Sequence, residues 1–447
     1  MKKSDIDTIF SLATLPGRSG VAVFRVSGPQ ASEIAREISG ANLLKPRLCS
    51  LRTFKSRDKT PIDQGLQIYM PGPGSFTGED CLELQTHGSL AVIEAMSAAL
   101  YEAGARQAEA GEFTRRAFEN GRMDLTEAEG LADLIDAETE GQRIQALRQM
   151  RGGLKTRYTS WRESLFDALA QIEGEIDFPD EADIPNALAH KAFDPLNTLA
   201  LDMTDALSDF RRGERVRHGL DIAIIGAPNA GKSSIINNLA QREAAIVTDI
   251  AGTTRDIVDV NMDVAGLPVR ISDTAGLRES EDIIEAEGIR RGLERARACD
   301  VRILVHDARD PVIDLKCLNS LKAGDFVLLN KSDLAQISPH SLAVDVVVMA
   351  VSAKTGEGML DFKTALERAA IERFSPSQNA GLTRMRHKEC VERGLNAVNG
   401  AIKALGVAPE LAGDDIRAAL QALRELSGEM DIEAVFDRIF SRFCVGK

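Results

Sequence analysis

A short motif in the middle of the chain has the residue types and spacing that bind phosphate groups. Gly226-Ala-Pro-Asn-Ala-Gly231-Lys232-Ser233 matches a phosphate-binding loop. Its glycines let backbone N–H groups approach phosphate oxygens, and Lys232 supplies a cation to the outer phosphates. The Ser233 hydroxyl can bind Mg²⁺. The motif therefore predicts that the chain binds a nucleoside triphosphate.

A second motif, Asn330-Lys331-Ser332-Asp333, reads the base. The Asp333 carboxylate can accept hydrogen bonds from both N1–H and the exocyclic amine of guanine, a donor pair that adenine lacks. Ser352-Ala353-Lys354 follows the next apolar run and can contact the base oxygen. The nucleotide is therefore expected to be GTP.

Two further motifs lie between these loops, in the order of a Ras-like P-loop GTPase. In Asp273-Thr-Ala-Gly276-Leu277 the aspartate can hold Mg²⁺ through water, and Gly276 can bond the γ-phosphate. Thr254 is the candidate switch threonine, whose hydroxyl meets Mg²⁺ together with that of Ser233. We expect contacts with GTP from Asn229, Ala230, Gly231, Lys232, Ser233, Ser234, Thr248, Thr254, Asp273, Thr274, Ala275, Gly276, Asn330, Lys331, Asp333, Ser352, Ala353 and Lys354.

The catalytic group of this GTPase is unusual, because Leu277 stands where a Ras-like enzyme keeps a water-orienting glutamine. Transition-state charge on the phosphates needs a cation, and Asn229 offers a carbonyl oxygen for a monovalent one. Backbone carbonyls around Thr248 and Ile250 can complete that shell. A carboxylate of the acidic stretch 279–285 must then place the water, and spacing alone does not choose among its acids.

The elements that position these motifs form three regions. Residues 1 to about 118 mix strands, such as 21–26, 66–69 and 81–85, with helices. Residues 221 to about 374 alternate strand and helix, which is typical of a parallel sheet. The segments on either side are helical, with apolar residues at helical spacing (Trp161, Leu165, Leu169, Ile172, Ile176; Ile416, Leu420, Leu423, Leu426).

Neither helical segment has much core of its own, so we expect a GTPase domain inserted into one helical domain. The alternative is a separate helical module on each side. We expect boundaries at 1–118 for the N-terminal domain, 119–215 for the first part of the helical domain, 216–377 for the GTPase domain and 378–447 for the second helical part. The fold class is thus multidomain, α/β and all-α, with an N-terminal α+β domain.

Composition narrows the setting of the protein. No apolar run is long enough to span a bilayer, and the polar start leads into no signal peptide. The six cysteines form no pair or cluster with the spacing of a zinc site. We therefore expect a cytoplasmic protein that does not associate with a membrane. A net charge of -14 argues against indiscriminate nucleic-acid binding but allows a local basic site.

Motifs along nearly the whole chain resemble those of the MnmE (TrmE) family, the tRNA-modifying GTPases of bacteria and organelles. Inside the GTPase region these are residues 228–234, 243–256 and 273–279. The flanks contribute Pro-Gly-Arg-Ser-Gly-Val at 16–21, Ser-Phe-Thr-Gly-Glu-Asp at 75–80, Gly-Glu-Phe-Thr-Arg-Arg-Ala-Phe at 111–118, Ile-Asp-Phe-Pro-Asp at 176–180 and the terminal Phe-Cys-Val-Gly-Lys at 443–447.

The resemblance implies roles for particular residues. Asn229, Thr248, Ile250 and Thr253 would surround K⁺, and Glu285 would position the attacking water. The N-terminal domain would be a folate-binding-like, dimerising domain whose contacts are Arg25, Glu83, Arg122 and Lys447. Arg122 stands where relatives carry lysine and keeps the charge. Cys444 matches a cysteine needed for modification, and its other interpretation is a small buried apolar side chain.

The activity implied by the resemblance is modification at C5 of the wobble uridine, position 34, of certain tRNAs to carboxymethylaminomethyl- or aminomethyluridine. It would use GTP, Mg²⁺, K⁺ and a one-carbon unit from 5,10-methylene- or 5-formyl-tetrahydrofolate. The chain would be a homodimer that shares the work with flavin-dependent MnmG (GidA) in a heterotetramer-type complex. This chain has no Gly-x-Gly-x-x-Gly dinucleotide motif of its own, which fits that division.

Two other functions remain open at this point. A ribosome-assembly switch GTPase would carry an RNA-binding module after the GTPase domain, whereas residues 382–447 have no Gly-x-x-Gly and are predicted to be helical. A folate-dependent transferase with a regulatory GTPase is the second. For tRNA we expect contacts from two basic stretches of the helical domain, or else these are solvated helix faces (Arg148, Arg151, Lys155 and Arg157; Arg384, Arg386 and Lys388).

Overall fold

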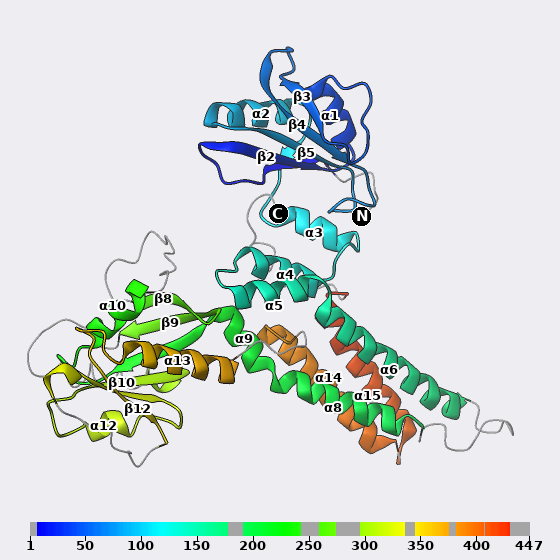
Figure 1. Cartoon of the computed structure of the whole chain (residues 1–447). Coiled ribbons are helices and arrows are strands. Elements are labelled where there is room, and N and C mark those ends of the chain that lie inside the picture. The colour runs from blue at the N-terminus through cyan, green and yellow to red at the C-terminus, as the bar shows by residue number, and fades with distance from the viewer. Residues whose placement is uncertain are drawn as a thin grey trace, which may run out of the picture. The chain divides into compact units, whose positions relative to one another are not determined.

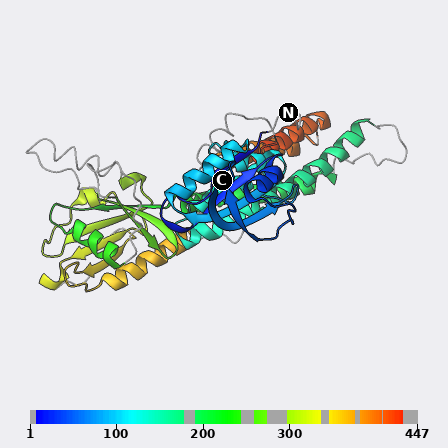
Figure 2. The ribbon, with the colours of Figure 1, turned by 90° about the horizontal axis from the view of Figure 1, so that it is seen from above.

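The computed structural model describes residues 7–177, 191–242, 259–273, 296–335, 345–374, 381–405 and 407–429. The chain forms two compact units, divided in sequence after Ala132 and after Leu423. Figures 1 and 2 show the ribbon from two directions. No described helix is long and apolar enough to cross a membrane.

The first unit is built on a six-stranded sheet with the order β3-β4-β5-β2-β1-β6, in which only the short β1–β6 pair is parallel. The strands predicted around 21–26, 66–69 and 81–85 are confirmed as β2, β4 and β5. The elements are β1 (Ile9–Leu12), β2 (Ser19–Ser27), α1 (Ala31–Ser39), β3 (Ser50–Lys55), β4 (Pro61–Met70), β5 (Cys81–Gly88), α2 (Leu90–Glu102), β6 (Arg106–Gln107), α3 (Glu112–Glu119) and α4 (Leu125–Ile135).

One face of this sheet carries the core of the first unit. Because side chains alternate along a strand, Phe24 and Val26 of β2 point to the same face. They pack there with Ile34 of α1 and with Met96 and Leu100 of α2. The intervening residues of β2, including Arg25, therefore lie on the other face and are available for a ligand.

The helices of the second unit join segments from both sides of the nucleotide-binding region. Gly394 of α14 lies against Met203 of α8, and Gly413 of α15 lies near Ile172 of α6. These contacts confirm that the nucleotide-binding domain is inserted into one helical domain, rather than standing between two modules. The elements are α5 (Glu140–Met150), α6 (Gly153–Asp177), α8 (Phe193–Ser208), α9 (Phe210–His218), α14 (Met385–Ala404) and α15 (Pro409–Ser427).

The inserted domain, green to yellow in Figures 1 and 2, has a six-stranded sheet with the order β12-β11-β10-β7-β9-β8. Leu220–Ile225 is buried along its length except for Asp221, as expected for a central strand covered on both faces. The elements are β7 (Leu220–Ile225), α10 (Lys232–Arg242), β8 (Asp259–Val264), β9 (Leu267–Asp273), β10 (Val301–Asp307), α12 (Leu315–Leu318), β11 (Phe326–Asn330), η1 (Ser332–Leu334), β12 (Val347–Val351) and α13 (Met359–Phe374).

The sheet is parallel, as predicted, except at one edge. β8 runs antiparallel to β9, whereas the other pairs are parallel. Ala265 and Gly266 connect the two strands with φ of 55° and 82°. A two-residue turn of this kind makes a tight hairpin and leaves no chain for a crossover helix. The alternation in 259–264 before Ala-Gly is only a weak sequence signal for this hairpin.

Candidate functional site

The phosphate-binding loop connects β7 to α10, and close backbone contacts fix its path. A Cβ atom on Gly226 would lie 2.1 Å from the carbonyl oxygen of Val305 in β10. One on Gly231 would lie 2.1 Å from the amide nitrogen of Asn330. Both glycines also have positive φ, 144° and 96°, so these positions exclude larger residues. Asn229 between them adopts φ 61° without being glycine.

Lys232 places its charge at the loop itself. Its ammonium donates to the carbonyl oxygens of Gly226 at 2.9 Å and Ala227 at 2.8 Å, and the residue is buried. Lys232 is also the first residue of α10, so the positive end of the helix dipole faces the same place. The arrangement is suited to binding an anion. The exposed Ser233 and Ser234 lie in the first turn of the same helix.

Asn330 joins three loops rather than facing solvent. Its amide nitrogen donates to the carbonyl of Ala230 at 2.8 Å, and its amide oxygen accepts from the N–H of Ala353 at 3.0 Å. The residue is only 2% exposed. Asn238 of α10 reaches the carbonyl of Ala353 at 3.4 Å. The structure thus brings together the phosphate-binding and guanine-reading residues predicted from separate motifs.

Lys331 links the guanine-reading loop to Asn229. Its ammonium donates to the backbone oxygen of Asn229 at 2.7 Å and lies 2.7 Å from the carboxylate of Asp307. Asp307 ends β10 and pairs in register with Asn330 of β11. Hydrogen bonds from Arg309 and then Lys331, which outweigh burial, hold the pKa of the Asp307 carboxyl far below its usual value. The carboxylate therefore stays charged across the physiological range.

Asp333 is oriented for base recognition by a buried hydroxyl. Ser352 donates to the Asp333 carboxylate at 2.7 Å and accepts from the N–H of Thr355 at 3.2 Å. Lys331 adopts φ 65° just before η1, which turns the chain so that Asp333 can reach Ser352. Lys354, two residues after Ser352, is exposed. One oxygen of Asp333 is thus anchored while its carboxylate remains able to accept from guanine.

The residue types at the predicted magnesium site suit that ion. Asp273 ends β9, where its backbone pairs in register with Ile224 of β7, just before the phosphate-binding loop. A hydroxyl and a carboxylate are hard donors of the kind Mg²⁺ prefers. Asn229 likewise offers an amide oxygen. In the part of the chain that the structure describes, no group of three or more His, Cys, Asp or Glu gathers as a metal cluster.

Several predicted residues lie outside the described residues. These are the switch and potassium residues Thr248, Ile250, Thr253 and Thr254, then Thr274, Ala275, Gly276 and Leu277, the water-positioning candidate Glu285, and Cys444 and Lys447 at the C-terminal end.

In the first unit, two of the predicted folate residues, Arg25 and Glu83, meet on the sheet face opposite α1 and α2. Arg25 of β2 and Glu83 of β5 are directly paired across strands, with Nη2 and Oε1 at 3.1 Å. The guanidinium of Arg25 lies over the Phe76 ring, 5.6 Å from its centroid. Arg122 packs beside Gly78 in the same 75–80 loop. Cross-strand pairing thus joins Arg25 to Glu83, and the 75–80 loop contacts Arg25 at Phe76 and Arg122 at Gly78.

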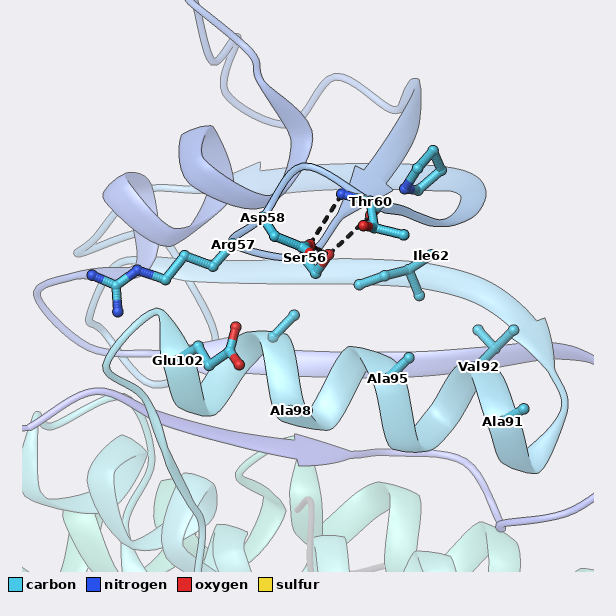
Figure 3. Close-up of a pocket in the computed structure, with 12 residues that line it drawn as sticks. Ser56, Arg57, Asp58, Thr60, Ile62, Ala91, Val92, Ala95, Ala98 and Glu102 are labelled. Atoms are coloured by element: carbon cyan, nitrogen blue, oxygen red, sulfur yellow. Dashed lines mark hydrogen bonds between the residues drawn. The ribbon is translucent and has the colours of Figure 1, made fainter.

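A separate groove of the first unit contains none of the predicted residues. It encloses about 860 Å³ between the β3–β4 turn and α2. Figure 3 shows the side chains of Ala91, Ala95 and Ala98 along one wall and Arg57 reaching outward from the turn. Its apolar wall and polar rim are distinct from the Arg25–Glu83 surface, because α2 covers the other face of the sheet.

The basic stretches expected to contact tRNA are partly engaged inside the helical domain. Arg157 lies 2.6 Å from the carboxylate of Asp202, and Arg384 lies 2.7 Å from that of Asp133. Arg157 also contacts Asp205 at 3.0 Å. These two guanidiniums tie helices together, so they contribute less to an RNA-binding surface than the sequence suggested.

Sequence reasoning missed three side chains of these sites. Asp307 and Asn238 lie outside the familiar motifs. Asp307 nevertheless follows a mostly apolar stretch, Val301 to His306, which is typical of a buried strand, so its position at a strand end could have been predicted. Phe76 belongs to a quoted motif, but only the folded loop shows that it lies under Arg25.

The phosphate-binding loop, the guanine-reading loops and the sheet that carries them define a P-loop GTP hydrolase. The family model described as "MnmE helical domain" matches residues 125–444, and that of "GTP-binding protein TrmE N-terminus" matches 8–122. The chain belongs to the MnmE family of tRNA modification GTPases.

Relatives agree over nearly full length. The tRNA modification GTPase MnmE of Maricaulis maris is 53% identical over 98% of this chain and 99% of its own. That of Caulobacter vibrioides is 46% identical over 99% and 100%. Among solved structures, the G domain of the T. maritima FeoB iron transporter is 25% identical over 34% of this chain and 98% of its own, with a TM-score of 0.27.

Proposed function

We propose that this chain is a potassium-dependent GTPase that acts with a flavin-dependent partner. Together they would modify C5 of uridine 34 in certain tRNAs to carboxymethylaminomethyl- or aminomethyluridine. The observation that carries the potassium requirement is Asn229, a non-glycine residue at φ 61° whose backbone oxygen is bound by Lys331. Asn229 carries an amide oxygen within the phosphate-binding loop, where a bound cation would offset phosphate charge.

In this proposal Asn229, Thr248, Ile250 and Thr253 hold K⁺, Ser233 and Thr254 hold Mg²⁺, and Glu285 positions water. The ions would supply charge stabilisation when bound. The direct test compares GTP hydrolysis in K⁺ and Na⁺ at equal ionic strength. Equal rates would remove the potassium requirement. Glu285→Ala should bind GTP normally and lose on the order of 10²-fold in kcat, as expected when water positioning fails.

The first unit is proposed to bind a tetrahydrofolate derivative, either 5,10-methylene- or 5-formyl-tetrahydrofolate, through Arg25, Glu83, Arg122 and Lys447. Support comes from the paired, partly exposed Arg25 and Glu83 beside an aromatic ring. Arginine matches the planar carboxylate groups of a folate tail, and a carboxylate can accept from a pterin amine.

Cys444 is proposed to serve modification and not GTP hydrolysis. Cys444→Ser keeps the size of the side chain and lowers its nucleophilicity, so it should abolish C5 modification of tRNA and spare GTP turnover. Purified protein gives the turnover, and nucleoside analysis of tRNA from a strain carrying only the variant gives the modification. Normal modification would return Cys444 to a packing role.

The remaining proposals concern assembly and boundaries. We propose a homodimer, a heterotetramer-type complex with MnmG (GidA), a cytoplasmic location, and domain boundaries at 118/119, 215/216 and 377/378. The break between α3 and α4 and the step from α9 into β7 support the first two boundaries. A ribosome-assembly GTPase is not favoured, because the described chain after residue 381 is the two helices α14 and α15.

A further inference from the structure

Asp307 lies outside the motifs of a GTPase, yet its carboxylate connects both ends of the nucleotide site. It holds the Lys331 ammonium at 2.7 Å, and the same ammonium binds the backbone oxygen of Asn229 at 2.7 Å. Lys331 sits in the guanine-reading loop, whereas Asn229 sits in the phosphate-binding loop. One carboxylate therefore fixes the cation that joins the two loops.

The backbone of Asn229 needs such support. A non-glycine residue at φ 61° is in the left-handed region, which costs on the order of 1 kcal/mol. The hydrogen bond from Lys331 helps to retain that conformation, and Lys331 can donate there only while its flexible side chain is held. Asp307 is itself held by Arg309, whose Nη2 lies 2.7 Å from the carboxylate.

We propose that Asp307 is a positioning residue: it fixes Lys331 so that guanine recognition and the orientation of Asn229 are coupled. This inference rests on the proposed role of Asn229 as a potassium ligand. Without the carboxylate, Lys331 would sample other rotamers and Asn229 would spend less time in the cation-binding conformation. The main effect is then a weaker apparent affinity for K⁺, with less change in the rate at saturating K⁺.

The test measures GTP hydrolysis by Asp307→Asn, Asp307→Glu and wild type over a K⁺ series at constant ionic strength. Asp307→Asn should raise the K⁺ concentration for half-maximal rate about tenfold, equivalent to about 1.4 kcal/mol, with kcat at saturating K⁺ within about twofold of wild type. Asp307→Glu, which keeps the charge, should recover part of that shift. A structural role alone would lower thermal stability without moving the K⁺ curve.

Asp310→Asn is the matched control. This exposed carboxylate lies in the same loop and accepts from the N–H of Val312 at 3.0 Å, away from Lys331. It should leave the K⁺ curve unchanged. Equal K⁺ curves for Asp307→Asn and wild type would overturn the inference while leaving the potassium requirement standing. Absence of a potassium effect in the wild type would overturn both.

A different observation concerns the basic hairpin, defined as residues 45–59 of the first unit. In a chain of net charge -14 it holds six cations and one acid. That acid, Asp58, is used within the turn, where it accepts from the Ser56 hydroxyl and the N–H of Thr60. Among the described residues, no ion pair is found for Lys45, Lys55, Arg57 or Lys59.

Protection of a sheet edge does not account for this charge. β3 is an edge strand, and charges commonly blunt such edges. However, only Arg52 and Lys55 of the six cations belong to β3, and the others lie in the flanking turn and loop. Arg47, Arg57 and Lys59 are exposed. The cations thus extend beyond the strand at both of its ends.

From this charge complementarity we infer that the basic hairpin contacts the phosphate backbone of tRNA, the substrate class of the family and of the proposed function. The Arg157 and Arg384 side chains of the helical domain are engaged with carboxylates, whereas Arg57 and Lys59 of the hairpin are exposed. Phosphate contacts release counterions, so they give binding a measurable salt dependence.

The test measures tRNA binding by the full chain at several KCl concentrations. Arg57→Gln with Lys59→Gln should reduce the slope of log K against log salt by about two, and a control with Arg36→Gln and Arg115→Gln, of equal net charge, should not. GTP hydrolysis should be unchanged in both. An unchanged slope, or no binding by the wild type, would overturn the assignment. Loss of dimerisation with an unchanged slope would identify a protein interface instead.

Discussion

The nucleotide site and the proposed folate surface use their polar side chains in opposite ways. In the nucleotide site, Asn330 and Lys331 bind backbone atoms of other loops, so they build the site as well as serve it. On the proposed folate surface, Arg25 and Glu83 bind each other across two strands that would pair without them. The first site should therefore fail when one side chain is removed, whereas the second should keep its shape.

Asn330→Ala should have the largest effect. It removes both bonds and leaves the buried Ala230 carbonyl and Ala353 N–H without partners, which costs about 3 kcal/mol, or over about 100-fold in GTP affinity. Binding of a fluorescent GTP analogue measures this. Asn238→Ala, which removes only the 3.4 Å contact, is the control. Equal losses in the two variants would mean that Asn330 is not the main link.

Gly226→Ala should come next. The added methyl group would lie 2.1 Å from the Val305 carbonyl, at a backbone φ of 144°. We expect a loss of about 2 kcal/mol or more in the unfolding free energy of the GTPase domain. Gly40→Ala in the first unit is the control: φ is 67°, but nothing lies within 4 Å of the added atom. Comparable losses would show that backbone conformation, and not the contact, matters at Gly226.

Arg25→Ala should change stability little and binding much. Its pair with Glu83 is about a quarter exposed on each side, and such pairs contribute about 1 kcal/mol or less. Folate titration followed by calorimetry should show loss of binding, whereas Arg115→Ala, at a more exposed pair with Glu119 within one helix, should show none. Unchanged folate binding in Arg25→Ala would remove this residue from the proposed site.

The smallest change concerns thiol reactivity. Burial, reinforced by Asp314, raises the pKa of Cys317 to about 11, so at pH 8 on the order of 0.1% is thiolate. Because the thiolate is the reactive form, alkylation of Cys317 should be slow at pH 8 and faster as pH approaches 11. Exposed Cys49 serves as the internal reference in mass spectrometry. Equal rates at pH 8 would show that the Cys317 pocket opens readily.

The sequence was informative where function depends on contiguous residues. The phosphate-binding loop, its glycines and the base-reading loops could be placed because backbone geometry dictates their types. The insertion was also predictable, since neither helical segment has enough apolar surface to fold alone. Arg25 and Glu83 were identified only by family resemblance. They lie far apart in sequence and are paired across β2 and β5, so no local sequence pattern marks the pair.

Two other features could not be found in this way for physical reasons. The contact of Asp307 with Lys331 depends on strand register between β10 and β11, which hydrophobic pattern does not specify. The direction of β8 depended on a two-residue turn whose Ala-Gly sequence is a weaker hairpin signal than Asn-Gly.

The insertion also sets a schedule for biosynthesis. Helices α6 and α8 leave the ribosome before α14 and α15, and the whole GTPase domain is made in between. At ordinary translation rates their apolar faces wait about ten seconds or more for their partners. A folded GTPase domain shortens the distance between the two helical segments, because the two ends of a domain usually lie close together. Variants that slow folding of the GTPase domain should therefore expose the helical domain to chaperones and proteases.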